Sequence, residues 1–232
     1  MLLYCQCQLV CLITSFHLYY CLTYAQSHAG YNRNQYKIAF SAMPFTFFHI
    51  FYTYQNTAPE WFKNQAAGAV VVILNLKTRE FKLPESIKKM RNLRVLILTD
   101  YGVEYQTEFT NPGLFTSLGK LRRIKLQQVS LSYPCKLKNV HKLCLYMCKV
   151  REAFENNSME FSKAMPTLVE LNIDYCKDLV GLPVGFCNIA TLKKLSICSC
   201  PKFFELPQEI GKLEKLELLR ISHFAEFKEM PE

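Results

Sequence analysis

Residues 168–176 read LVELNIDYC and residues 192–200 read LKKLSICSC, so the same apolar pattern ends in a cysteine at the same offset twice. The pattern, L-x-x-L-x-L with Ile or Val as variants, recurs along the chain. Its three apolar positions are Val71, Leu74, Leu76; Leu93, Leu96, Leu98; Leu121, Ile124, Leu126; Val140, Leu143, Leu145; Leu168, Leu171, Ile173; Leu192, Leu195, Ile197; and Leu216, Leu219, Ile221. The first positions of the seven units are residues 71, 93, 121, 140, 168, 192 and 216. The distances between successive first positions are close to the length of roughly 20–29 residues that leucine-rich repeats show.

A second half-motif, Leu-Pro followed by apolar residues, leads from one unit into the next. It occurs at Leu83-Pro84, Leu182-Pro183 and Leu206-Pro207. Proline lacks a backbone N–H and therefore suits a point where the chain leaves a strand. We expect these prolines to mark turns toward the convex side of the repeat array.

Alternation within each leucine pattern predicts a short strand whose residues point inward and outward in turn. A single unit cannot bury its leucines alone, whereas stacked units share one core. We therefore predict an α/β fold over residues 66–232. It is a leucine-rich-repeat solenoid (horseshoe) of about seven repeats, with a parallel sheet on the concave face.

The eleven cysteines are interpreted by spacing rather than number. No pair has the C-x2-C form from which a closed zinc site usually starts, so we expect no metal site and reduced thiols. Cys148, Cys176 and Cys200 stand three residues after the last apolar position of their units. There we expect them to point inward and to bond turn backbone. Cys144 and Cys198 are predicted to face outward.

Residues 1–65 have a different composition, apolar and aromatic, and no lasting period of 2 or 3.6. We assign no structure to them, and two explanations stay open: an unstructured segment, or translated non-coding sequence. Residues 1–27 contain no Lys, Arg, Asp or Glu, which makes them a candidate for a signal peptide or a membrane anchor. Gln6 and Gln8 interrupt the apolar run, and the basic residues that precede a signal core are missing.

The formal charge of +9 and pI of about 9.0 suit an acidic partner. Clusters of Lys and Arg are short, so we expect no nucleic-acid binding. Residues 113–121, GLFTSLGKL, have the wrong glycine spacing for a phosphate loop and carry Leu where a magnesium-binding hydroxyl belongs. His141, His223, Asp174 and Cys144 lie on separate repeats without a nucleophile-elbow context. We expect no catalytic residue, no cofactor and no enzyme activity.

A family resemblance covers about two thirds of the chain. Residues 71–76 read VVILNL, Leu83-Pro84 follows, and residues 90–102 read MRNLRVLILTDYG. Later segments read LNIDYCKDL at 171–179 and LSICSCPK at 195–202. These stretches resemble the leucine-rich-repeat region of plant nucleotide-binding leucine-rich-repeat disease resistance proteins, in particular the helper subgroup with a coiled-coil bundle.

The resemblance implies a protein-interaction module of a cytoplasmic plant immune protein. It implies immune receptor domains or signalling proteins as partners, rather than membranes or small molecules. No nucleotide-binding switch is recognisable in this sequence, so no nucleotide-binding residue is carried over. The alternative is a secreted or membrane-associated receptor fragment, which requires residues 1–27 to act as a signal or anchor. The paired cysteines that usually cap extracellular plant repeats are not found beside the first repeat.

Strand alternation also predicts which side chains face a partner, because the concave face of a solenoid is its usual binding surface. The mixture of basic and aromatic residues there suits a protein interface. Our candidates are Arg123, Lys125, Lys142, Tyr146, Glu170, Asn172, Asp174, Tyr175, Lys194, Ser196, Arg220, Ser222 and His223. Thr99 and Asp100 are expected to face outward in an earlier repeat.

Overall fold

The computed structural model describes the backbone of residues 35–40 and 48–53, and residues 68–102, 105–131, 136–155, 160–183 and 185–224. The chain divides into two compact units, Met1–Asn34 and Gln35–Glu232, and all described residues belong to the second. No helix in the described part has the length and hydropathy of a membrane-spanning segment.

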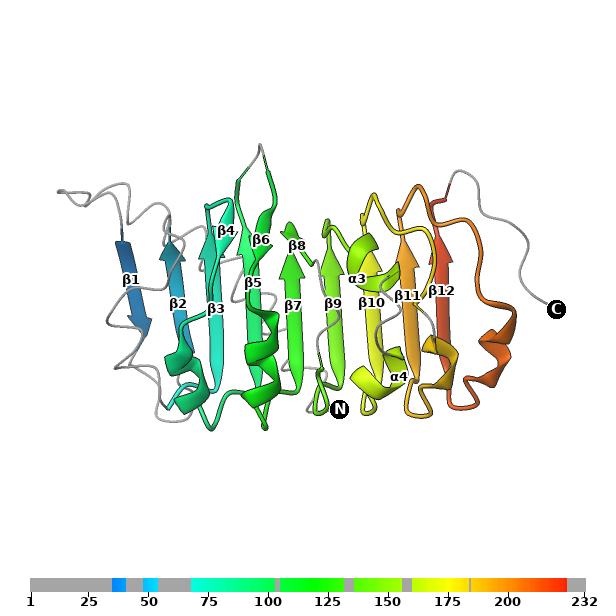
Figure 1. The fold of residues 1–232 in the computed structure, drawn as a ribbon, viewed down its shortest axis with the longest axis horizontal. Coiled ribbons are helices and arrows are strands. Elements are labelled where there is room, and N and C mark those ends of the chain that lie inside the picture. Colours follow the sequence, from blue (N-terminus) through cyan, green and yellow to red (C-terminus); the bar gives the residue numbers. More distant parts are fainter. Residues whose placement is uncertain are drawn as a thin grey trace. The chain divides into compact units, whose positions relative to one another are not determined.

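The second unit is built on a nine-stranded sheet (Figure 1). In sheet order its strands are β1 Gln35–Phe40, β2 Phe48–Thr53, β3 Val71–Leu76, β5 Val95–Asp100, β7 Arg123–Gln127, β9 Lys142–Tyr146, β10 Glu170–Asp174, β11 Lys194–Cys198 and β12 Leu218–Ser222. All neighbours pair in parallel except β1 and β2, which are antiparallel. The seven strands from β3 to β12 carry the leucine pattern and confirm the predicted repeat fold.

Strands β1 and β2 come from the region to which we assigned no structure, and β2 pairs in parallel with β3. The proposed boundary at residues 65 and 66 stays a prediction.

The register of the first leucine unit was predicted wrongly. Val72 pairs with Leu96 and Leu74 pairs with Leu98, so the unit is Ala69, Val72 and Leu74 rather than Val71, Leu74 and Leu76. Every residue of β3 is buried, and the strand is apolar throughout except for Asn75. Because both of its faces are buried, the sequence shows no alternation that could fix the register.

Short helical segments cover one face of the sheet (Figure 1). They are the 3-10 helices η1 Glu85–Lys89, η2 Pro112–Ser117, η3 Phe186–Asn188 and η4 Gln208–Lys212, and the α-helices α3 Arg151–Glu155 and α4 Phe161–Ala164. Pro84 and Pro207 immediately precede η1 and η4 with φ of −70° and −58°. Both prolines lie where the chain turns into the helical layer, in agreement with the predicted turns toward the convex side.

The core lies between the sheet and this helical layer. The second leucine position is fully buried in the middle repeats, with Leu96, Leu171 and Leu195 all at 0% exposure. The equivalent Leu219 in β12 is only half-buried.

A second, three-stranded parallel sheet follows the main strands of three repeats: β4 Glu80–Phe81, β6 Thr107–Phe109 and β8 Val129–Ser130. Buried Asp100 anchors the loop before β6, because its carboxylate accepts hydrogen bonds from the backbone N–H groups of Gly102 (2.7 Å) and Thr107 (2.9 Å). The Asn111 side chain bonds both the N–H and the C=O of Leu83, each at 2.8 Å. These contacts join neighbouring repeats outside the main sheet.

Two acidic side chains join repeats within the helical layer. Asp178 accepts hydrogen bonds from the N–H groups that open α3, and Glu160 accepts one from Asn188 Nδ2 at 2.8 Å. Gly185 adopts a left-handed φ of +73°, and a Cβ added to it would lie 2.1 Å from Cγ of Glu160. Only glycine fits this position without displacing that carboxylate.

Candidate protein-interaction surface

The face of the main sheet that points away from the helical layer is here called the open face. Parallel pairing aligns its outward side chains into rows that run across the strands. The row at the strand starts is Val71, Val95, Arg123, Lys142, Glu170, Lys194 and Leu218. The middle row is Ile73, Ile97, Lys125, Cys144, Asn172, Ser196 and Arg220, and the row at the strand ends is Asn75, Thr99, Gln127, Tyr146, Asp174, Cys198 and Ser222.

The character of the open face changes between β5 and β7. On β3 the outward side chains of Val71 and Ile73 are buried, with exposures of 6% and 7%. From β7 onward the outward positions are half-buried or exposed, and all except Cys144, Cys198 and Leu218 are charged or polar. The part of the sheet from β7 to β12 is therefore the accessible polar surface.

All thirteen predicted contact residues lie on this surface and none is buried. Eleven occupy the three rows, whereas Tyr175 and His223 come directly after β10 and β12. Their role in binding a partner stays a prediction. Thr99 lies in the outward row as expected but is buried. The expectation for Asp100 was wrong, because its buried carboxylate anchors its own loop.

A charged cluster occupies the row at the strand starts. Lys142 Nζ lies 2.6 Å from Glu170 Oε1, which also accepts a hydrogen bond from Asn172 Nδ2 at 2.9 Å. Burial raises the pKa of Glu170, but the hydrogen bonds from Lys142 and Asn172 outweigh it and the pKa is lowered. Glu170 is thus a stable carboxylate that neutralises Lys142, and the remaining basic residues give this row a positive charge.

An aromatic pair stands at the opposite ends of the strands. The rings of Tyr146 and Tyr175 meet edge to face with centroids 5.6 Å apart, and Tyr175 is 47% exposed. Between them in the chain, Asp174 has a pKa raised by burial. Its Oδ1 is buried and accepts no hydrogen bond from the described residues. The pair offers a rigid, accessible aromatic surface of the kind that anchors protein partners.

The residues after the last five main strands adopt a left-handed conformation although none is glycine. They are Gln128, Met147, Tyr175, Ser199 and His223, with φ between 53° and 62°. In the first four, the backbone N–H donates to a strand carbonyl of the following repeat, at 2.9 to 3.1 Å. These bonds hold a conformation that non-glycine residues otherwise avoid. Tyr175 and His223, which directly follow β10 and β12, lie at the rim of the open face.

Beneath this rim lies the cysteine position that the repeat predicted. Cys148, Cys176 and Cys200 are buried, with exposures of 0–1%, and their thiols donate to strand carbonyls, as Cys148 does to Leu126 O at 3.4 Å. Burial raises the pKa of Cys148 to about 11. A hydrogen bond with Cys200, together with burial, raises the pKa of Cys176. These thiols are structural, as predicted.

Besides Gln127, three residues of the open face from β7 to β12 were not among the predicted contacts. Cys144 and Cys198 had been assigned to the outward face, and both lie there half-buried. Leu218 is 40% exposed at the start of β12. Alternation around Leu219 would have placed Leu218 outward, but a leucine inside a leucine motif is easily taken for core.

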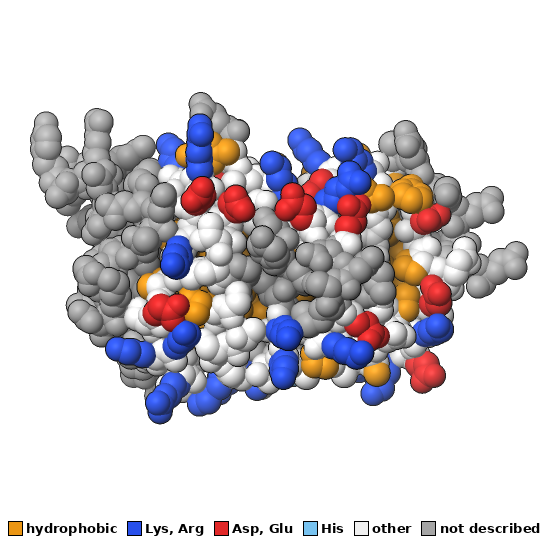
Figure 2. Space-filling view, viewed as in Figure 1, with side chains coloured by type: hydrophobic (Ala, Val, Ile, Leu, Met, Phe, Trp, Pro, Cys, Tyr) orange, Lys and Arg blue, Asp and Glu red, His pale blue; other side chains and the backbone are white. Residues whose placement is uncertain are grey.

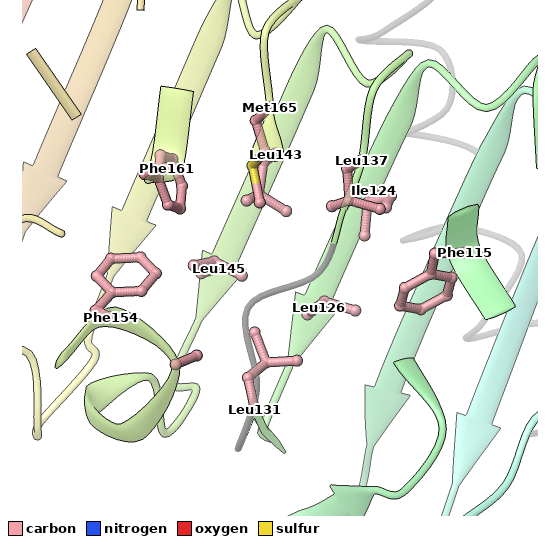
Figure 3. A pocket seen from close by; sticks show the side chains of 11 residues that line it. Phe115, Ile124, Leu126, Leu131, Leu137, Leu143, Leu145, Phe154, Phe161 and Met165 are labelled. Carbon is pink, nitrogen blue, oxygen red and sulfur yellow. The ribbon is translucent and has the colours of Figure 1, made fainter. Parts of the chain in front are cut away.

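A cavity of about 30 Å³ lies between β7, β9 and the helical layer. Figure 3 shows the side chains that line it. All of its lining side chains are apolar, among them Leu126, Leu145 and Phe154. It lies in the shortest predicted repeat, where the described residues between β8 and β9 contain no helix. The cavity is far smaller than the roughly 300 Å³ or more of a typical cofactor site, so we interpret it as a packing defect.

The helical face differs from the open face. Figure 2 shows mainly Lys and Arg along the edge where the strands begin, and Asp and Glu mixed with them along the opposite edge.

Among the described residues, no group of three or more His, Cys, Asp or Glu side chains is arranged to hold a metal ion. The open face can act through hydrogen bonds, ion pairs and aromatic contacts.

Seven parallel strands with the leucine pattern, a helical layer and a polar open face define a leucine-rich-repeat protein. No protein-family model matches the chain. It is similar to disease resistance protein ADR1 of Arabidopsis thaliana, with 37% identity over 158 residues, which are 66% of this chain and 20% of that protein. A probable disease resistance protein of the same plant is 34% identical over 158 residues, 66% of this chain and 38% of that protein. The chain therefore spans only a fifth to two fifths of these relatives.

Solved structures with a similar fold are also leucine-rich-repeat proteins. One is the leucine-rich-repeat domain of the type III effector XopL, with a TM-score of 0.46 and 15% identity, covering 77% of each chain. Another is a Leptospira interrogans leucine-rich-repeat protein, with a TM-score of 0.43 and 19% identity, covering 76% of this chain and 54% of the other.

Proposed function

We propose that the chain is a protein-recognition module of a plant disease resistance protein of the helper, coiled-coil-bundle subgroup, and that it binds its partner through the open face of β7–β12. The observation that carries the proposal is the accessible polar surface itself. Three aligned rows there combine basic, amide and aromatic side chains on a rigid sheet. Such a surface recognises a protein by shape and charge and needs no cofactor.

The comparison with Arabidopsis disease resistance proteins supports the biological setting. We infer a cytoplasmic, non-enzymatic protein whose repeats restrain a switch or couple it to signalling partners. The partners are immune receptor domains or signalling proteins rather than nucleic acids, membranes or small molecules. Because the chain matches only part of its relatives, the switch it acts on is either on the same polypeptide or on another.

The test compares two variants of the full chain with equal changes in charge. The open-face variant carries Lys125→Glu, Lys194→Glu and Arg220→Glu. The matched control carries Lys82→Glu, Lys89→Glu and Lys212→Glu, three exposed lysines outside the open face. Each tagged protein is expressed in leaves, cross-linked and purified, and the bound proteins are quantified by mass spectrometry together with the immune response to a pathogen.

We expect immune proteins to be enriched with the wild-type chain and the control, and lost from the open-face variant with a changed immune response. Equal enrichment with all three proteins would refute recognition through the open face. An unchanged immune response in every line would refute the role in immunity.

A further inference from the structure

In the part of the chain that the structure describes, three cations of the open face are not directly bonded to an acidic side chain. They are Lys125 on β7, Lys194 on β11 and Arg220 on β12. Within the described residues, none of their side chains forms a hydrogen bond or an ion pair within 4.0 Å. Lys194 interacts electrostatically with Glu170 and Glu217, but Glu170 is already bonded by Lys142 and Asn172, and Glu217 by Lys193. Positive charge on this surface is therefore left for an external anion.

A low floor lies between these cations. In the middle row, Lys125 and Arg220 are separated by the short, uncharged side chains of Cys144, Asn172 and Ser196. All three are half-buried. A chain lying across the strands could approach this floor closely while its own side chains reach the cations on either side.

The length of the row sets the length of the ligand. Parallel strands lie about 4.8 Å apart, so the four steps from β7 to β12 span about 19 Å. An extended polypeptide advances about 3.3 Å per residue and crosses this distance in about six residues. The Tyr146 and Tyr175 rings border the floor at the strand ends and offer an apolar contact to the same segment.

We propose that the open face of β7–β12 binds an extended, acidic protein segment of about six residues or more, whose carboxylates contact Lys125, Lys194 and Arg220. This inference rests on the proposed function and names the chemistry of the partner. Charge complementarity selects the segment, and the net charge of +9 steers it toward the protein. A nucleic acid fits less well, because Glu170 and Asp174 stand among the cations and repel a continuous phosphate backbone.

The test uses fluorescence anisotropy with the purified full chain and labelled peptides of about twelve residues, about twice the length of the row. One peptide alternates Glu and Ser, and its neutral counterpart alternates Gln and Ser. A single-stranded RNA of similar length is the third probe. The proteins are the wild type and the two triple variants defined above, each checked for an unchanged unfolding midpoint.

We expect the Glu peptide to bind the wild type, to lose affinity as salt is added, and to bind the open-face variant at least roughly tenfold more weakly. The control variant should stay within about twofold of the wild type. Equal loss in both variants, or equal binding of the Gln peptide, overturns the proposal because binding would then not depend on this surface or on carboxylates. Tighter binding of the RNA, with the same dependence on the open face, overturns it in favour of a nucleic acid.

This experiment and the leaf experiment fail separately. Capture of immune proteins through the open face without binding of the Glu peptide would leave the proposed function intact and reject the acidic segment. Binding of the peptide without open-face-dependent capture would reject the immune role and keep the ligand chemistry.

Discussion

The carboxylate of Asp178 accepts a hydrogen bond at 3.0 Å from the backbone N–H of Arg151, which opens a helix in the preceding repeat. The same carboxylate accepts the N–H of Val150 at 3.0 and 3.1 Å. A residue of one repeat thus caps the helix α3 of another. The cap is coupled to the stacking of the repeats because the donors and the acceptor belong to different units.

Replacement of Asp178 by Ala should lower the free energy of unfolding by about 1–2 kcal/mol, since two backbone N–H groups lose their acceptor. Chemical denaturation of the full chain measures this change. Asp178→Asn should recover most of it, because an amide oxygen also caps helices well. An Ala variant as stable as the wild type would show that water replaces the carboxylate without cost.

Gly185→Ala should destabilise the protein by about 1–3 kcal/mol, because the left-handed φ is strained and the new methyl group collides with Glu160. Gly181→Ala is the matched control, since a Cβ there meets nothing within 4 Å. Adding Glu160→Ala to Gly185→Ala should recover the part due to the collision. If the two glycine variants unfold at the same denaturant concentration, the strain at Gly185 is not real.

Glu160 should make stability depend on acid pH. Hydrogen bonds from Asn188, Lys163 and Ser162 lower its pKa from the ordinary value of 4.5 to about 2. Because the folded pKa is lower than the unfolded one, the stabilisation is complete above about pH 4.5 and is lost as the pH falls toward 2.

Unfolding midpoints measured across this range should therefore fall more steeply for the wild type than for Glu160→Gln. Asn188→Ala should reduce the slope as well, because it removes the largest cause of the shift. Parallel pH profiles for wild type and Glu160→Gln would contradict the assignment.

Cysteine alkylation should separate the two classes of thiol. In the native protein near neutral pH, iodoacetamide should label Cys198 and Cys144 and leave Cys148, Cys176 and Cys200 unlabelled, because the last three are buried. Burial raises the pKa of Cys144, so its labelling should accelerate as the pH rises. Peptide mass spectrometry gives the sites, and labelling in guanidinium chloride provides the fully reactive control. Rapid native labelling of Cys176 would contradict the inward position.

The leucine pattern was sufficient to predict seven strands, the inward cysteines and the thirteen accessible side chains. Period-2 alternation determines which way each side chain points once the strand is located. The same logic failed at β3, where Val71, Val72 and Ile73 are all buried and any register looks equally apolar.

Other features depend on contacts between residues far apart in the sequence. Asp178 meets Arg151 across 27 residues, and the Asn111 side chain meets Leu83 across 28. Nothing in the local sequence distinguishes Asp178 from an ordinary surface acid. Asp100 was expected to face outward with Thr99, although period-2 alternation from Leu96 and Leu98 places it on the inward face. Strands of two or three residues, such as β4 and β8, carry too little pattern to be predicted.

The row of left-handed residues gives the solenoid a direction. The residues that directly follow the strands, from Gln128 to Ser199, donate their backbone N–H to a carbonyl of the following repeat. The backbone N–H groups at each strand start instead donate to a carbonyl of the preceding repeat. Loss of the last repeat would therefore release Ser199 from the conformation that only its neighbour stabilises. Unfolding from the C-terminal side would relax one strained residue per repeat. Mechanical pulling on that end should therefore open the array stepwise, because the strain released in each repeat favours the opening of the repeat before it.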